Sequence, residues 1–441
     1  MKSGAGALLA LLGMCGCAQN AVTATPASTI VPASSSQKIQ HVVIIFQENR
    51  TTDDLFNGFP GADTVRTGLN SKGRQVPLRP VNLTAPYDLD HTHSGFEQEY
   101  ANGKLDGFNG ENSTCQGGTV CAPASVRAYG YVPQSEVQPY FTMAEQYTFG
   151  DEMFQTNQGP SFPAHQYIVS GTSTVSNSST LRAAENPDHP NGGGVGGCDS
   201  PADTLDPLIN TAGIESEKAY PCFNRISLMQ LADRQSVTWR YYQAMSGPGI
   251  WNAPDAVLAI RKNPEFANDV VAPSSQVLTD IANGKLADIT WVTPTALASD
   301  HAMANNGSVP SWVAAVVNAI GESPLWSSTA IVVTWDDWGG WYDHVAPPLY
   351  NSYELSFRVP LVVISPYAKN HYVSHVQHEF GSILKFTEET FGLPSLHTTD
   401  ERADDLSDCF DFSKSPTRFK HIPAAYPPKY FLTQRSTEPD N

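Results

Sequence analysis

The chain has 441 residues, with 26 Lys and Arg against 44 Asp and Glu, so its formal net charge is −18. A nucleic-acid-binding protein presents a basic face, and this charge balance argues against that class. With 40% hydrophobic and 10% aromatic residues, the chain can bury a core and is neither a disordered nor an integral membrane protein. The sequence therefore predicts a globular protein.

Residues 1–18 have the pattern of a secretory signal, with Lys2 followed by an apolar run over 5–14 and then small residues. The run is too short to span a bilayer. Residues 19–37 are rich in Ser, Thr, Ala and Pro, which predicts a linker. We expect export to the periplasm or the medium, with a lipid anchor at Cys17 as the less favoured alternative.

After removal of the signal, five cysteines remain, an odd number. In an oxidising compartment this number predicts two disulfides and one free thiol. Cys115 and Cys121 share one Gly-, Asn-, Ser- and Pro-rich region, and Cys198 and Cys222 share another. We therefore expect these two local pairs, which would tie down loops, and a free Cys409.

Short apolar runs rich in β-branched residues recur along the chain, and they read as strands buried on both faces. These runs are 41–46, 289–292, 330–335 and 359–365. Between them lie stretches with helical spacing of apolar residues, notably 311–320 and 381–391. Strands that alternate with helices predict an α/β fold with a mostly parallel sheet. The long connections 58–130 and 170–222 predict a cap over the sheet edge.

Polar side chains follow two of these strands directly. Glu48 and Asn49 come after the first, and Asp336 and Asp337 after the third. Because ligands of open α/β sheets bind beyond the carboxyl ends of strands, these oxygens could converge on a divalent cation. Each pair alone is more typical of a helix cap or a turn.

A serine and several histidines add candidate chemistry. Ser161 lies between a Gly-Pro turn and a proline that can open a helix, where backbone N–H groups can hold a phosphate oxygen. A plain N-cap is the alternative for a single serine. His91, His301 and His344 each follow an aspartate that can orient an imidazole or keep it protonated near a phosphate.

Taken together, these motifs resemble a known family. The segment HVVIIFQENRTTDDLF resembles the opening of the bacterial phosphoesterase family, which contains phosphatidylcholine-type and plant phospholipases C and acid phosphatases. The resemblance continues in order through GPSFPAHQYIVSGTS, IVVTWDDWGGWYDHVAPP and HEFGSILKFTEETFGLPSL. It implies an alkaline-phosphatase-like three-layer α/β/α sandwich, with a catalytic domain over 38–412 and a short tail over 413–441.

The resemblance also implies roles for individual residues. Glu48, Asn49, Asp336 and Asp337 match the ligands of one divalent metal ion, and Ser161 matches the nucleophile. The matches to the active-site histidines, which contact phosphate or protonate the leaving group, are His91, His301 and His344. Asp300 and Asp343 match residues behind this site, and Arg358 and His378 match recurring positions to which we give structural roles.

Oxygen ligands favour calcium, magnesium or manganese, and zinc stays open. The chain departs from the family at Thr51 to Asp54, where a Ser-Phe-Asp-His step is usual, and at Trp338, which replaces a histidine.

These features favour a phosphoesterase of broad, acid-phosphatase-like specificity that works through a phosphoserine. Ser161 agrees with the acid-phosphatase branch, and the tail is too short to be a domain. The alternative is a phospholipase C that cleaves phosphocholine-type diesters and contacts a membrane peripherally. A non-catalytic phosphate-binding lipoprotein is the second alternative. The expected partner is a phosphate ester, either a small molecule or a phospholipid headgroup, and no nucleic acid.

Overall fold

The computed structural model describes Met1 and residues 38–117, 121–192 and 195–437. The expected signal and linker therefore lie, apart from Met1, outside the described residues. Residues 33–441 form one compact unit, and the fold below is that of its described part. No helix in these described ranges is both long enough and apolar enough to cross a membrane.

The centre of this unit is an eight-stranded sheet. From edge to edge its strands are β14 (Val270–Val271), β13 (Trp239–Tyr242), β15 (Ile289–Val292), β1 (His41–Gln47), β16 (Thr329–Trp335), β17 (Leu361–Ile364), β8 (Thr148–Gly150) and β18 (Tyr372–Ser374). Only β17 runs antiparallel to its neighbours. The four strands expected from the sequence are all present, and the mostly parallel α/β sheet is confirmed.

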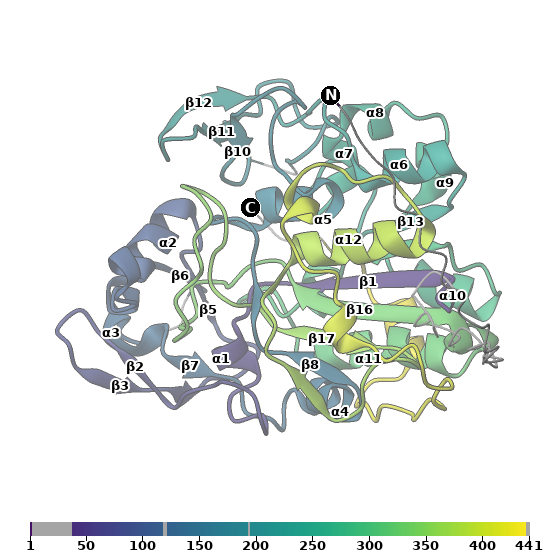
Figure 1. Ribbon diagram of the computed structural model, residues 1–441. Helices are drawn as coiled ribbons and strands as arrows, with labels where there is room; N and C mark the ends of the chain where they lie inside the picture. The colour runs from purple at the N-terminus through teal and green to yellow at the C-terminus, as the bar shows by residue number, and fades with distance from the viewer. Residues whose placement is uncertain (2–37, 118–120, 193–194, 438–441) are drawn as a thin grey trace, which may run out of the picture. The chain divides into compact units, whose positions relative to one another are not determined.

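Helices cover both faces of the sheet (Figure 1). Phe46 packs against His165 of α5 (Ser161–Ser170) and Phe380 of α12 (Phe380–Phe391). Trp335 packs against Tyr140 of α4 (Gln138–Gln146). Trp335 is in register with Gln47, the neighbour of Phe46, and successive strand residues point to opposite faces. Helices α5 and α12 therefore cover one face and α4 the other, which makes three layers.

Further helices surround the sheet. They are α1 (Thr52–Leu55), α6 (Leu228–Gln235), α7 (Ala253–Ala256), α8 (Leu258–Arg261), α9 (Phe266–Asp269), α10 (Gln276–Ala282), α11 (Val309–Gly321) and α13 (Pro428–Thr433). Helices α11 and α12 are the two that helical spacing predicted. In the expected tail, Phe431 of α13 packs on Trp312 of α11.

The long connections form small structures of their own. The first holds β2 (Thr67–Leu69), β3 (Gln75–Pro77), β4 (Arg79–Pro80), β5 (Tyr87–Leu89), α2 (His93–Tyr100), β6 (Ser113–Cys115), α3 (Ala124–Arg127) and β7 (Gly130–Tyr131), and the second holds β10 (Arg182–Ala183), β11 (Asp206–Ile209) and β12 (Glu215–Ala219). A short pair of β9 (Met153–Phe154) and β19 (His378–Glu379) lies outside both.

Both expected disulfides are present in these connections. Cys115 is bonded to Cys121 and Cys198 to Cys222. Cys409 is free and buried.

Candidate active site

The adjacent carboxyl ends of β1 and β16 bring the first candidate residues together. Because Gln47 is in register with Trp335, the residues that follow lie side by side, and the Asp336 N–H donates to the Gln47 carbonyl at 2.9 Å. Asn49 has a φ of +64° and donates its backbone N–H to Asp336 Oδ1 at 3.2 Å. Two distant sequence segments therefore form one polar edge.

A turn at Gly339 fixes the carboxylate of Asp337, the residue after Asp336. Gly339 donates its backbone N–H to Asp337 Oδ1 at 2.7 Å and has a φ of +63°. A Cβ at this position would lie 2.4 Å from the carbonyl oxygen of Asn49. Glycine is therefore required here for its backbone conformation and for this close approach.

Ser161 faces these carboxylates as the first residue of α5. Its Oγ lies 3.3 Å from Glu48 Oε2 and 3.2 Å from Asp337 Oδ2. All three side chains are buried. The unpaired backbone N–H groups at the start of the helix favour an anion beside Ser161.

The electrostatics of this edge are unfavourable for the protein alone. Burial and the charge of Asp336 raise the pKa of Glu48 well above its usual range, and the same two effects raise the pKa of Asp337. Three carboxyl groups are buried side by side, and none of them has a Lys or Arg partner among the ion pairs of the described residues. A bound cation would offset this repulsion.

The donor set fits such a cation. Asn49 Oδ1 and Asp336 Oδ2 are buried and have no hydrogen-bond partner within the described part of the chain. Orphaned oxygens of this kind are costly unless something binds them. The carboxylate and amide oxygens of Glu48, Asn49, Asp336 and Asp337 are suitable ligands for a hard or borderline divalent ion.

Two of the three predicted histidines lie beside Ser161. His91, His301 and Ser161 line one cavity of about 660 Å³. His91 contacts Asn49, with its Nε2 3.0 Å from the amide nitrogen. Burial opposes the charged form of His91, but the carboxylates of Asp337 and Asp88 raise its pKa to about 9.

Comparison with known proteins identifies the family. The phosphoesterase family matches residues 39–394. The chain belongs to the phosphoesterase family. This match spans the central sheet and all of the site residues described above.

Curated relatives of this phosphoesterase-family chain include two bacterial phospholipases. It is 25% identical to a non-hemolytic phospholipase C of Pseudomonas aeruginosa, over 90% of this chain and 62% of that protein. It is 24% identical to phospholipase C A of Mycobacterium tuberculosis, over 86% of this chain and 78% of that protein. A solved structure, a protein of the alkaline phosphatase superfamily from Vibrio parahaemolyticus, is similar with a TM-score of 0.39 and 9% identity, over 84% of this chain and 70% of that one.

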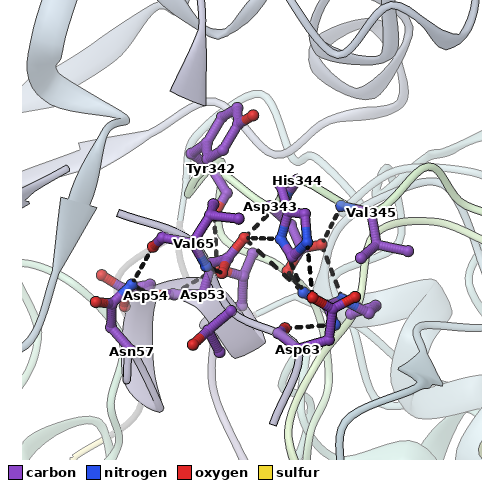
Figure 2. A network of polar contacts seen from close by, with 12 residues as sticks. Asp53, Asp54, Asn57, Asp63, Val65, Tyr342, Asp343, His344 and Val345 are labelled. Carbon is purple, nitrogen blue, oxygen red and sulfur yellow. Dashed lines mark hydrogen bonds and ion pairs between the residues drawn. The ribbon is translucent and has the colours of Figure 1, made fainter. Parts of the chain in front are cut away.

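The third predicted histidine belongs to a different network of the phosphoesterase chain. Figure 2 shows His344 between Asp53, 2.6 Å from Nδ1, and Asp63, 3.2 Å from Nε2. Asp343 accepts two hydrogen bonds from Arg358, at 2.9 and 3.1 Å. None of these five residues lines the cavity of Ser161, so the structure does not bring His344 and Asp343 to the nucleophile.

The remaining predicted positions have structural contacts. Asp300 accepts from Tyr140 at 2.8 Å and from the indole of Trp335 at 2.9 Å. Trp338 donates to the buried Glu99 at 2.6 Å. His378 bonds Asp404 at 2.9 Å, which links the start of α12 to a C-terminal segment.

The sequence interpretation assigned no role to His165, which lies inside the same group. Its Nε2 is 3.0 Å from Glu48 Oε1 and 3.8 Å from Asp336 Oδ2. Burial, opposed by the charge of Asp336, lowers the pKa of His165 to about 4. The signal that could have revealed it is its spacing, four residues after Ser161 on the same helix face.

Proposed function

We propose that this protein is a metal-dependent phosphoesterase that acts through a phosphoserine on Ser161. The observation that carries the proposal is the position of Ser161 Oγ, at a helix start, within 3.3 Å of Glu48 and Asp337 and open to a cavity. Membership of the phosphoesterase family supports it.

The proposed reaction is a double displacement. Ser161 Oγ loses its proton to water in the cavity and attacks phosphorus in line with the ester oxygen. The ester bond breaks, and the departing alcohol takes up a proton. Water then attacks phosphorus, the bond from phosphorus to Ser161 Oγ breaks, Ser161 recovers a proton from the attacking water, and the phosphate group is released. A divalent cation held by Glu48, Asn49, Asp336 and Asp337 would supply charge neutralisation for the phosphoryl oxygens and for the serine oxygen.

Of the two cavity histidines, His301 is the better general acid. Its Nδ1 donates to the Ala302 carbonyl at 2.7 Å, and its Nε2 has no hydrogen-bond partner among the described residues. The Nε2 of His91 already contacts the Asn49 amide. A protonated His301 can therefore give its Nε2 proton to the leaving alcohol.

The cavity favours a phosphodiester with a cationic headgroup. Asp88, Asp90 and Glu185 line it together with Ser161. Carboxylates attract a quaternary ammonium group and repel the extra negative charge of a monoester. The phospholipase C relatives agree with this substrate class. Broad acid-phosphatase activity is the second candidate, favoured by serine rather than threonine at position 161.

We also propose that the protein acts outside the cytoplasm. The two disulfides support an oxidising compartment. The N-terminal pattern that predicts export lies in the part of the chain that the structure does not describe.

The test is hydrolysis of p-nitrophenyl phosphate and p-nitrophenylphosphorylcholine by the purified chain supplied with divalent cations. We expect cleavage of the diester, and we expect Ser161→Ala to lower kcat by about 10³-fold or more. The matched control is Ser170→Ala, which changes a buried serine at the other end of α5. Equal activity of Ser161→Ala and wild type would remove Ser161 as nucleophile. Inactivity of the wild type on both esters would favour a binding protein.

The variant Glu185→Gln tests whether Glu185 contacts the cationic headgroup of the substrate. Burial and the charge of Glu215 raise the pKa of Glu185 to about 8. Glu185 is therefore neutral below that pH and gains its charge above it. We expect the KM for the choline diester to fall as pH rises through 8 in the wild type only. The same fall in Glu185→Gln would exclude this contact.

A further inference from the structure

His165 is held rigidly beside the nucleophile. It lies one helical turn after Ser161 on α5, so both side chains project from the same face of the helix. Its ring is fully buried, 6.1 Å from the ring of Phe46 and stacked at 6.5 Å on Trp251. The imidazole therefore cannot swing out to solvent.

We infer that His165 is a ligand of the cation, so that the site combines an imidazole nitrogen with its oxygens. The inference rests on the proposed function, because it adds a residue to the cation site used there. Its support is the hydrogen bonding of the other ring nitrogen, Nδ1, which faces Tyr241.

Tyr241 determines which ring nitrogen carries the proton. The Tyr241 hydroxyl donates its only proton to the Trp251 carbonyl at 2.7 Å. The same hydroxyl oxygen lies 3.4 Å from His165 Nδ1. Since the tyrosine proton is already used, a hydrogen bond across this gap requires the proton on Nδ1. A neutral His165 then has a bare lone pair on Nε2.

That lone pair points at carboxylates. His165 Nε2 is 3.0 Å from Glu48 Oε1 and 3.8 Å from Asp336 Oδ2. One ligand atom from each of these three residues lies within 4.8 Å of the other two. Asp336 Oδ2 has no hydrogen-bond partner in the described ranges. Three buried lone pairs that face one another repel unless a proton or a cation lies between them, and a divalent cation can contact all three.

The tautomer with its proton on Nε2 accounts for fewer of these contacts. A proton on Nε2 would make an ordinary hydrogen bond to Glu48, but it would leave a bare Nδ1 facing a tyrosine oxygen whose proton points elsewhere. It would also leave Asp336 Oδ2 without a partner. A metal-bound imidazole whose other nitrogen donates a hydrogen bond is the usual arrangement for histidine ligands.

A nitrogen ligand changes the metal that the site prefers. Oxygen ligands alone favour calcium, magnesium or manganese, as the sequence predicted. Imidazole suits zinc, iron, nickel or copper, whereas calcium prefers oxygen ligands. We therefore expect one borderline divalent ion, with calcium a weak competitor.

The experiment uses the full chain stripped of metal and loaded with Mn²⁺. Pulsed electron paramagnetic resonance detects ¹⁴N coordinated to Mn²⁺. We expect a ¹⁴N coupling in the wild type that is replaced by a ¹⁵N coupling when the protein is labelled with ¹⁵N-histidine. We expect the coupling to be absent in His165→Gln. The matched control is His93→Gln, since His93 is also buried and bonded to a carboxylate, Glu215, but does not line the cavity.

A second variant covers the case in which His165→Gln fails to fold. Tyr241→Phe removes the acceptor of the Nδ1 proton and keeps the ring. We expect it to weaken Mn²⁺ and Zn²⁺ binding by about 10- to 100-fold, as for other partners of metal-bound histidines, and Ca²⁺ binding less. Isothermal titration calorimetry with each of the three ions measures this difference in affinity between the wild type and Tyr241→Phe.

Three outcomes would overturn the inference: no ¹⁴N coupling in the Mn²⁺-loaded wild type, an unchanged coupling in His165→Gln, or no Mn²⁺ binding. Hydrolysis assays on the same samples separate the two proposals. A hydrolytically active wild type without ¹⁴N coupling rejects only the histidine ligand. An inactive wild type with the coupling rejects the proposed function and keeps the ligand.

Discussion

Two groups of buried carboxylates in this protein balance their charge in different ways. Around Ser161, the buried carboxyl groups of Glu48, Asp336 and Asp337 face one another, and Asp336 Oδ2 has no hydrogen-bond partner among the described residues. In the second group, which we call the Arg358 network, Asp53 and Asp343 lie against Arg358 and His344. Figure 2 labels Asp53, Asp343 and His344 of this network.

The difference distinguishes a structural ion-pair network from the site at which we propose a bound cation. The Arg358 network contains its own cations, and Arg358 also donates to the backbone carbonyls of Asp63 and Asp151 at 3.0 and 2.9 Å. It ties the loop after α1 to the segments before β9 and β17. The group at Ser161 has no Lys or Arg among the described ion pairs, and the His91 imidazole, whose pKa is raised to about 9, balances part of the charge of its three carboxyl groups. A buried charge that is not balanced internally is expected to bind a ligand.

Removal of Arg358 should have the largest effect on stability. Arg358→Met leaves Asp343 buried without its ion-pair partner and removes one of the two cationic neighbours of Asp53. We expect the free energy of unfolding to fall by about 3–5 kcal/mol, as for other broken buried ion pairs. Urea denaturation measures it, with the exposed Arg234→Met on α6 as the control. A loss of less than about 1 kcal/mol, the value of a surface pair, would contradict this account.

Much of the sheet could be predicted from the sequence because β1 and β16 are continuous apolar runs whose residues 42–46 and 329–335 are almost completely buried. The short strands of the connections gave no such signal, since β4, β7 and β10 have two residues each. Their position depends on partners far away in the chain.

The carboxylate edge was also predictable, because residues that follow adjacent parallel strands must meet. The sequence could not predict in this way which histidines lie at the active site. His301 and His344 both follow an aspartate, yet one lines the cavity and the other bonds Asp53, 291 residues away. His165 appeared as one histidine in an apolar segment, and its partners are distant in the chain: Glu48 follows β1 and Tyr241 lies in β13.

Binding of the divalent cation should have the next largest effect on stability. At 100 times its dissociation constant, a divalent cation should stabilise the wild type by about 2.7 kcal/mol. Asp337→Asn keeps the side-chain shape but removes one of the repelling charges. We expect this variant to be at least as stable as the wild type without cation, and to lose most of the gain with it.

Thermal unfolding with and without Mn²⁺ measures this gain, and Arg358→Met should retain it because its site is separate. An equal shift in the wild type and in Asp337→Asn would show that the cation binds elsewhere.

His344 should have the smallest effect, and that effect depends on pH. Burial opposes its charge, but the bond to Asp53 raises its pKa above the ordinary value of about 6.5. A raised pKa adds stability that is complete below about 6.5 and is lost as pH rises through the folded-state value. His344→Gln should therefore cost about 1.5 kcal/mol at pH 6, the contribution of a charged hydrogen bond, and less at pH 9. Urea denaturation at both values measures the difference, and His421→Gln, in an exposed pair with Glu322, serves as the control. A cost that does not change with pH would mean that His344 contributes by packing and is neutral in the Arg358 network.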